Sequence, residues 1–365
     1  MTRAASPNYV GAMQPGPNND IADVTGIGVG HYQRMGRGWL SGTTVIVPPV
    51  HSIGGVDVRG GGPATRDTDC LNPINMVSEV DAICLSGGSA FGLDTAGGVM
   101  TLLAERGRGF RVGPDPQSVV PIVPSAALFD LGAGGIFVNR PGADFGRRAA
   151  AKALMAAKRG RPIAQGTIGA GTGAHMAMLK GGVGSASTVT GDGIVVGALI
   201  VLNSSGTGID RRSGELWGTR YGIGDEFAHL HRPKQADLDA FIELMAKRWA
   251  LNTTLAVVAT NVTMDKPECT RLAGAGHDGL ARAISPIHNY TDGDIVFSLS
   301  TGAMTLPEAQ IEGFIRPVNN RFTRLGDVFT IAADTVARAV VHAIISSTST
   351  TEMTSYLEQF PSATI

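Results

Sequence analysis

The sequence contains few cysteines, only Cys70, Cys84 and Cys269 among 365 residues. Three cysteines this far apart exclude a disulfide framework and a zinc site built on a Cys-x-x-Cys pair. The formal net charge of −1 provides no excess of basic residues for binding nucleic acid or an anionic membrane surface. The longest apolar run, at 194–202, is far shorter than the ~20 residues that cross a bilayer.

The N-terminus also lacks the apolar segment of about 7–15 residues that a secretory signal requires. We therefore expect a cytoplasmic protein. The same stretch, MTRAASPNYVGAMQPGPNND, is rich in Pro, Asn and Gly and predicts a flexible tail at 1–20. Residues 21–365 are expected to form a single domain, because they are numerous enough to bury a sizeable core.

Glycine is present in excess, with 50 among 365 residues against a usual share of ~7%. No Gly-X-Y period accompanies it, which excludes collagen, and the 43% hydrophobic content is too high for a disordered chain. The composition predicts a globular α/β protein with many tight turns.

Short β-branched runs alternate with helical patterns along the chain. A helix is clearest after residue 234, where Leu238, Phe241, Ile242 and Met245 recur at helical spacing. The alternation predicts mixed sheets with helices covering both outer faces. We expect strands at 43–47, 82–85, 193–203, 255–259 and 295–297, and helices at 89–105, 147–158, 234–249, 266–284 and from 327 onward.

The segment Gly87-Gly88-Ser89 lies between a predicted strand and a predicted helix, where some hydrolases place a nucleophilic serine. Position 91 is phenylalanine, so the Gly-x-Ser-x-Gly pattern of a nucleophile elbow is absent. A tight turn with Ser89 near a helix N-cap is the favoured interpretation. Because the N–H groups of such a loop can hold an oxyanion or a carboxylate, the three residues stay candidates for substrate binding.

Motifs for cofactors and metals are weak. Segments 26–30 and 169–173 lack the third glycine of the dinucleotide-binding pattern, and no Gly-x-x-x-x-Gly-Lys-[Ser/Thr] phosphate loop occurs. His229 and His231 lie outside any His-Glu-x-x-His motif and have no cysteine partners. We expect neither a cofactor nor a metal.

Two short polar motifs flank predicted strands. Asn252-Thr253-Thr254 precedes one strand, and β-propensity alone explains its threonines; the Asn-x-Thr glycosylation pattern needs a secretory route that the sequence lacks. Asp292-Gly293-Asp294 is a turn signal. Its two carboxylates are also two residues apart, so they project to one face and repel each other unless a cation lies between them.

Two single residues complete the set of candidates. Lys180 is interpreted most simply as a solvated lysine, and Asn203, at the end of an apolar strand, as either a turn cap or a donor to a ligand. Singly, none of these features is specific for a function.

Taken in order along nearly the whole chain, these features resemble the family of L-aminopeptidase/D-esterase, the β-peptidyl aminopeptidases and the nylon-oligomer hydrolase. Five matches in the same order make coincidence a poor explanation. The matching stretches lie at 59–66, 85–93, 179–184, 252–254 and 292–294, in addition to 24–31 near the N-terminus.

The resemblance implies a precursor that cleaves itself once, between Asn252 and Thr253, into an α chain of 1–252 and a β chain of 253–365. It implies a four-layer αββα sandwich of the α/β (α+β) class, similar to N-terminal nucleophile hydrolases and shared with ornithine acetyltransferases. Family members commonly form homotetramers of the processed unit, so we expect a homo-oligomer.

The resemblance also assigns roles to the candidates. Thr253 would be the nucleophile, and its freed α-amine, with an unperturbed pKa of about 7.7–8.0, would be its own base. Lys180 would lie close and favour the neutral amine, while Asn203 would donate to the tetrahedral oxyanion. Asp292 and Asp294 would orient the nucleophile or hold the protonated N-terminus of a substrate.

One position departs from the family pattern, because Phe129 replaces a tyrosine that some members place beside the active site. A substrate-binding role without the hydroxyl is therefore expected there. The implied activity is hydrolysis of N-terminal residues from small peptides, amides or esters. The alternatives are an acyltransferase of the ornithine acetyltransferase type and an uncleaved protein that binds a small ligand.

Overall fold

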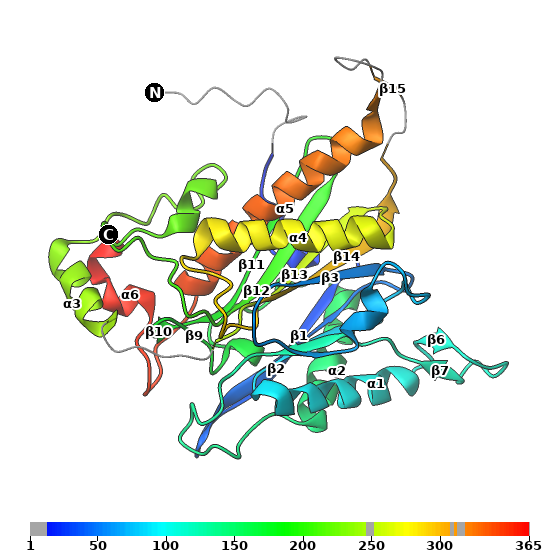
Figure 1. Cartoon of the computed structure of the whole chain (residues 1–365), viewed down its shortest axis with the longest axis horizontal. Helices are drawn as coiled ribbons and strands as arrows, with labels where there is room; N and C mark the ends of the chain where they lie inside the picture. The colour runs from blue at the N-terminus through cyan, green and yellow to red at the C-terminus, as the bar shows by residue number, and fades with distance from the viewer. Residues whose placement is uncertain (1–12, 246–251, 307–309, 312–317, 365) are drawn as a thin grey trace.

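The computed structural model describes residues 13–245, 252–306, 310–311 and 318–364. Two five-stranded sheets form its centre (Figure 1). The first has the order β1-β2-β5-β8-β4, with β1 (Gly28–Gly36), β2 (Trp39–Val47), β5 (Ile83–Ser86), β8 (Ser125–Ala127) and β4 (Ala64–Arg66). The second has the order β11-β12-β13-β14-β3, with β11 (Gly182–Val189), β12 (Val195–Leu202), β13 (Leu255–Val262), β14 (Ile295–Met304) and β3 (Ile53–Val58).

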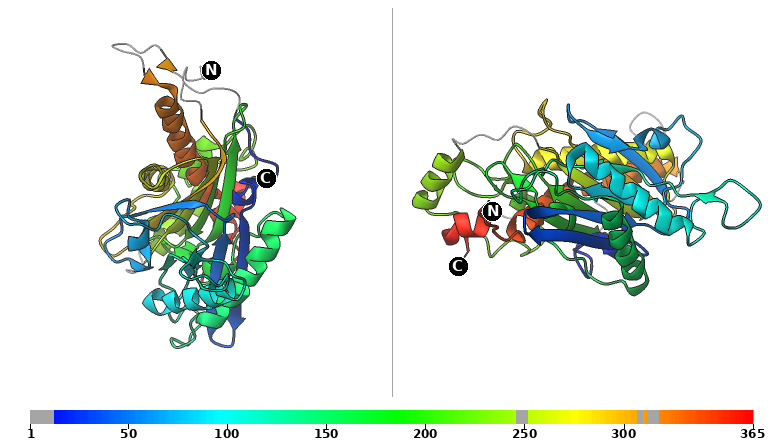
Figure 2. Two further views of the ribbon diagram at one scale, coloured as in Figure 1. Left: turned by 90° about the vertical axis from the view of Figure 1, so that its right-hand side faces the viewer. Right: turned by 90° about the horizontal axis from the view of Figure 1, so that it is seen from below.

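Helices cover the outer face of each sheet (Figures 1 and 2). Helices α1 (Thr95–Ala104) and α2 (Ala143–Arg159) pack on the first sheet, and α4 (Lys266–Ala283) and α5 (Asn320–Ile345) pack on the second. The layers therefore follow the order helix, sheet, sheet, helix, which confirms the predicted αββα sandwich.

Smaller elements lie outside the four layers. They are the helices α3 (Gln235–Met245) and α6 (Tyr356–Gln359), the strand pairs β6 (Phe110–Arg111) with β7 (Val119–Val120), β9 (His175–Met176) with β10 (Leu179–Lys180) and β15 (Gln310–Ile311) with β16 (Val318–Asn319), and the 3-10 helices Ile21–Asp23, Thr68–Leu71, Ser89–Asp94, Gly169–Gly171, Trp217–Tyr221 and Pro361–Ala363.

Strand β13 shows how the layers share the core. Leu255, Val257 and Ala259 face the cluster between the two sheets, whereas Ala256 and Val258 face the cluster beneath α4 and α5. Side chains alternate between the faces of a strand, so a strand covered on both sides has an uninterrupted apolar sequence. This burial explains why the apolar run after Thr254 predicts a strand correctly.

Part of the glycine excess lies where helices approach strands closely. A Cβ built on Gly28 or Gly30 of β1 would lie 2.1 Å from a carbonyl oxygen of α2. On Gly184 of β11, it would lie 2.2 Å from the carbonyl oxygen of Ala339 in α5. Glycine at these positions allows helix backbone to pack directly on the sheet.

Helix α5 is apolar enough, over residues 321–345, to match the length and composition of a membrane-spanning helix. However, 72% of its most apolar window is buried inside the protein. Packing against the second sheet accounts for this composition.

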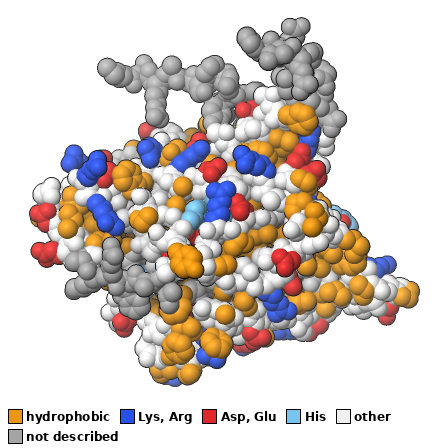
Figure 3. Space-filling view, viewed as in Figure 1, with side chains coloured by type: hydrophobic (Ala, Val, Ile, Leu, Met, Phe, Trp, Pro, Cys, Tyr) orange, Lys and Arg blue, Asp and Glu red, His pale blue; other side chains and the backbone are white. Residues whose placement is uncertain are grey.

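On the face seen in Figure 3, acidic and basic side chains are interspersed.

Several predicted boundaries shift. The helix predicted from residue 89 begins as a 3-10 helix and becomes α-helical only at Thr95, because Gly88 and Ser89 adopt left-handed φ values of 91° and 52°. Helix α2 begins four residues before the predicted start at 147, and α5 begins at Asn320 rather than 327. The final residues of the helix predicted at 234–249, from 246 onward, lie outside the described residues.

The predicted flexible tail is too long. Gln14 exchanges two backbone hydrogen bonds with Val189 of β11, and Asp20 caps the 3-10 helix Ile21–Asp23. Residues 13–20 therefore belong to the folded domain, while 1–12 lie outside the described residues.

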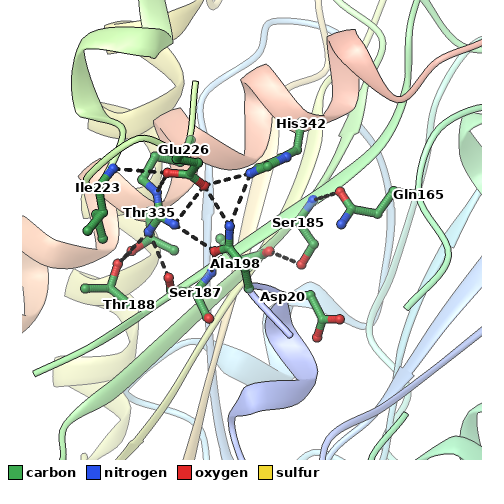
Figure 4. Close-up of polar contacts among 12 residues, drawn as sticks. Asp20, Gln165, Ser185, Ser187, Thr188, Ala198, Ile223, Glu226, Thr335 and His342 are labelled. Atoms are coloured by element: carbon green, nitrogen blue, oxygen red, sulfur yellow. Dashed lines mark hydrogen bonds and ion pairs between the residues drawn. The ribbon is translucent and has the colours of Figure 1, made fainter. Parts of the chain in front are cut away.

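A buried ionic network ties this N-terminal segment to α5. The Glu226 carboxylate accepts hydrogen bonds from Arg338 (2.6 and 2.9 Å) and from Asn19 (2.7 Å), and it contacts the His342 ring at 2.8 Å. Figure 4 shows Glu226 beside His342 and above the β11 residues Ser187 and Thr188. Burial opposes ionisation of Glu226, but the contacts with His342, Arg338 and Asn19 outweigh it and lower the pKa of the carboxyl below its ordinary value of 4.5.

This network predicts an acid-sensitive stability. As the pH falls below about 4.5, unfolded chains take up a proton at Glu226 while native molecules keep the carboxylate ionised, so the free energy of unfolding decreases. Glu226→Gln should lower the free energy of unfolding at neutral pH. In this variant, the free energy of unfolding should also decrease less as the pH falls below about 4.5. Urea unfolding between pH 3 and 7 measures both effects, with the exposed Glu358→Gln as control. An unchanged acid slope in Glu226→Gln would remove Glu226 from this role.

Candidate active site

The segment Asn252-Thr253-Thr254 enters β13 at the end of the second sheet, next to the first residues of β14. The Thr253 N–H donates to the Asn203 carbonyl at 2.7 Å, and the Thr254 N–H donates to Asp294 Oδ1 at 2.7 Å. Thr253 is 4% exposed. Four of the sequence candidates therefore lie close together: Thr253, Asn203, Asp292 and Asp294.

The Asn252 carbonyl is held from two sides. The Thr253 hydroxyl donates to its oxygen at 2.6 Å, and the Gly293 N–H donates to the same oxygen at 3.0 Å. The hydroxyl thus lies beside the peptide group that precedes it, and a backbone donor polarises that group. Both features favour attack by the hydroxyl on this carbonyl.

Gly293 must be glycine for this arrangement. A Cβ at this position would lie 2.7 Å from Thr253 Oγ1 and 2.7 Å from the Gly62 carbonyl oxygen. Gly60 is required for the same reason, because a Cβ on it would lie 2.2 Å from the Asp294 nitrogen. Two of the motifs found in the sequence, at 59–66 and 292–294, are therefore in direct contact.

If the Asn252–Thr253 bond cleaves itself, as the family resemblance implies, we expect Gly293→Ala to fold but to leave this bond intact, because the added methyl group displaces the Thr253 hydroxyl. Gly62→Ala is the matched control, since its Cβ would have no neighbour closer than 3.6 Å. Denaturing gels of the two purified variants compare them. Normal cleavage of Gly293→Ala would show that this close packing is not needed.

The two aspartates of the turn have different surroundings, although both are fully buried. Asp294 accepts hydrogen bonds on both oxygens, from Thr254 on Oδ1 and from His288 on Oδ2. Asp292 Oδ2 accepts from Ser205 (2.7 Å) and Asn289 (3.1 Å), whereas its Oδ1 has no hydrogen-bond partner among the described residues. Burial raises the pKa of Asp292, and the charge of Asp294 adds to that rise.

Asn203 follows β12 and presents its side-chain amide in a defined orientation. Its Oδ1 accepts the His175 N–H at 2.9 Å, which places the NH₂ group on the opposite side. The acceptor recorded for that NH₂ group is the distant Phe129 carbonyl, at 3.5 Å. The geometry leaves Asn203 with an N–H donor for a ligand, which is one of the two roles considered for it from the sequence.

Lys180 is linked to Thr253 indirectly. Its ammonium group donates to the carbonyls of Gly171, Ala174 and Gly181 at 2.6–2.8 Å, which uses all three of its donors. In the described part of the chain, no hydrogen bond joins it to Thr253 or to the two aspartates of the turn. Lys180 is connected to Thr253 through Ala174, the neighbouring His175 and Asn203, whose carbonyl accepts the Thr253 N–H.

Burial lowers the pKa of Lys180 to about 7, although the nearby Asp130 charge opposes that shift. Burial also lowers the pKa of His175 to about 4, so His175 is neutral at physiological pH. The acidic group whose charge acts on Lys180 is therefore Asp130, not Asp292 or Asp294, as a charge cluster around Thr253 would require.

A cavity of about 250 Å³ is lined by residues that contact Asn203, although Asn203 itself is not part of its lining. Phe129 and His175, which both contact Asn203, lie in its wall. The substrate-binding role of Phe129 stays a prediction. Most of the other side chains in its lining are apolar: Leu131, Ala133, Ala177, Met178, Leu244 and Met353.

The loop Gly87-Gly88-Ser89 does not provide free donors. Its three N–H groups donate to the Gly42 carbonyl, to Asp130 Oδ1 and to the Leu128 carbonyl. These amides are therefore not free to hold an oxyanion or a carboxylate of a substrate, and the one carboxylate they do hold is that of Asp130. Instead, the loop fixes Asp130, whose neighbour Phe129 lines the cavity.

Sequence reasoning missed His288, Asn289, Ser205 and Asp130. None of the four lies in a recognisable motif. Each contacts its partner only because the chain folds back on itself, which a local sequence pattern does not reveal. No group of three or more His, Cys, Asp or Glu side chains suited to a metal ion occurs within the described ranges.

Comparisons with known proteins show the family of the chain. The model of the family described as peptidase family S58 matches residues 19–356. An uncharacterised aminopeptidase of Mycobacterium leprae is 44% identical over 95% of this chain and 96% of its own length. A 6-aminohexanoate-oligomer endohydrolase of Kocuria sp. is 30% identical over 78% of this chain and 76% of its own length.

Similarity extends to solved structures. The L-aminopeptidase D-Ala-esterase/amidase of Ochrobactrum anthropi, described as a variant of the Ntn hydrolase fold, superposes over 96% of both chains. The TM-score is 0.67 at 21% sequence identity, so this likeness concerns the fold. Together, the family match and the M. leprae relative show that the chain belongs to peptidase family S58 and is a hydrolase of the aminopeptidase type.

Proposed function

We propose that the chain is an aminopeptidase that activates itself by cutting the Asn252–Thr253 bond. The observation that carries the proposal is the position of the Thr253 hydroxyl, 2.6 Å from an Asn252 carbonyl oxygen that also accepts the Gly293 N–H. The hydroxyl oxygen bonds to the carbonyl carbon, the carbon–nitrogen bond breaks, and the nitrogen takes up a proton. Water then hydrolyses the resulting ester, leaving chains of 1–252 and 253–365.

In the processed enzyme, Thr253 carries a free α-amine beside the Asn203 carbonyl, which accepts a hydrogen bond from this nitrogen before cleavage. An α-amine has an unperturbed pKa of about 7.7–8.0, so at neutral pH a useful fraction is neutral and can take the hydroxyl proton. Thr253 then attacks the substrate carbonyl as nucleophile and base in one residue. Asn203 donates its NH₂ group to the oxyanion that forms.

Asp292 and Asp294 have different roles in this proposal. Asp294 uses both oxygens to hold Thr254 and His288, so it orients the chain at the nucleophile. Asp292 keeps one buried oxygen without a partner among the described residues, so it is the carboxylate available to an ammonium group. An ammonium-binding carboxylate favours substrates with a free amino terminus, and the cavity of about 250 Å³ favours small ones.

The proposal is tested with a panel of aminoacyl p-nitroanilides, each offered with a free and with an acetylated amino group. Hydrolysis of the free-amine compounds, by protein that runs as two bands on a denaturing gel, is the expected result. One intact band without hydrolysis would favour a protein that binds a ligand and does not cleave it. Transfer of the acyl group to an added amine in preference to water would favour an acyltransferase.

A further inference from the structure

His288 is joined to the nucleophile segment through a single carboxylate. Asp294 Oδ2 accepts two hydrogen bonds from His288, one from its backbone N–H at 3.0 Å and one from ring Nδ1 at 2.9 Å. The other oxygen of the same carboxylate accepts the Thr254 N–H at 2.7 Å. The position of the residue that follows Thr253 therefore depends on how Asp294 is held.

The backbone of His288 is in an unusual conformation. Its φ is 58°, in the left-handed region, which is unfavourable for a residue with a Cβ. This conformation lets the backbone N–H and the ring nitrogen of one residue reach the same carboxylate oxygen. Such conformations persist where surrounding contacts impose them, and they occur most often at functional sites.

The ring of His288 is packed in place. It meets the His277 ring edge-on, with centroids 4.7 Å apart, and the His277 ring contacts the Asp57 carbonyl at 2.9 Å. The His288 side chain is 18% exposed and the Asp294 side chain is 0% exposed. Because Nδ1 is directed at a carboxylate, it carries the proton, and the ring orientation is defined.

We propose that His288 is a positioning residue for the nucleophile. By fixing the rotamer of Asp294, it sets the backbone at Thr254 and hence the direction of the Thr253 hydroxyl, before cleavage toward Asn252 and afterwards toward the substrate. This inference rests on the proposed function, because it concerns the same threonine. It assigns His288 no contact with the substrate.

Two substitutions separate hydrogen bonding from backbone conformation. His288→Gly keeps the left-handed backbone without strain but removes the ring donor. His288→Asn also tolerates that conformation, and its side-chain NH₂ group can replace Nδ1 as donor to Asp294. Both variants are compared with the wild type in three measurements: the rate of self-cleavage, kcat and KM on a free-amine p-nitroanilide, and the midpoint of thermal unfolding.

We expect His288→Gly to cleave itself slowly and, once processed, to show a kcat about tenfold to a hundredfold below wild type with little change in KM. His288→Asn should restore most of both rates. Wild-type rates in His288→Gly would overturn the proposal, and so would equal losses in both variants, since the donor would then not matter. Wild-type protein that is active without cleavage would instead refute the proposed function, so the two failures are distinguishable.

Discussion

Thr253→Ala is expected to remain one intact chain and to lose hydrolysis by about a thousandfold or more. The substitution removes the hydroxyl that lies 2.6 Å from the Asn252 carbonyl oxygen, so no ester can form. It also removes the nucleophile that the mature enzyme would use. Denaturing gels and p-nitroanilide assays measure the two losses separately.

Two controls make this result specific. Thr253→Ser keeps a hydroxyl and should still cleave itself. Thr254→Val keeps the backbone N–H that binds Asp294 and removes a hydroxyl that has no hydrogen-bond partner among the described residues, so it too should be processed. Cleavage in Thr253→Ala would show that another residue attacks the bond.

Asn203→Ala should separate maturation from turnover. In the uncleaved chain, Gly293 and Thr253 donate to the Asn252 carbonyl oxygen, and the Asn203 NH₂ group points toward Phe129. Self-cleavage should therefore proceed in the variant. Turnover should fall by about 10²–10³, which is the effect of losing one oxyanion donor.

Asn203→Asp tests the same point with a side chain of nearly the same shape. It retains an oxygen for the His175 N–H but replaces the donor with a second acceptor, so we expect a loss of turnover at least as large. A folded Asn203→Ala protein that fails to cleave would show that maturation and turnover share their oxyanion donor.

The sequence was most informative about the layers of the fold. Strand β13 is buried on both faces, and this double burial produces the apolar run from Leu255 that identifies it. Helix starts were less predictable, because a left-handed turn such as that at Gly88 and Ser89 depends on contacts with residues distant in the chain.

For the site, the motifs identified the residues but not their connections. The turn at Asp292-Gly293-Asp294 does lie against Thr253, as the family resemblance implied. By contrast, the three carbonyls that engage Lys180 come from a loop whose course no local pattern reveals. His288 went unnoticed for the same reason, since its partner Asp294 is reached only through the folded turn.

Intact-mass spectrometry of protein that is turning over a substrate tests the central claim most directly. We predict two masses, corresponding to residues 1–252 and 253–365, with threonine as the N-terminal residue of the smaller chain. A single mass near 37.7 kDa in a fully active sample would contradict the account, because Thr253 would then have no free amine.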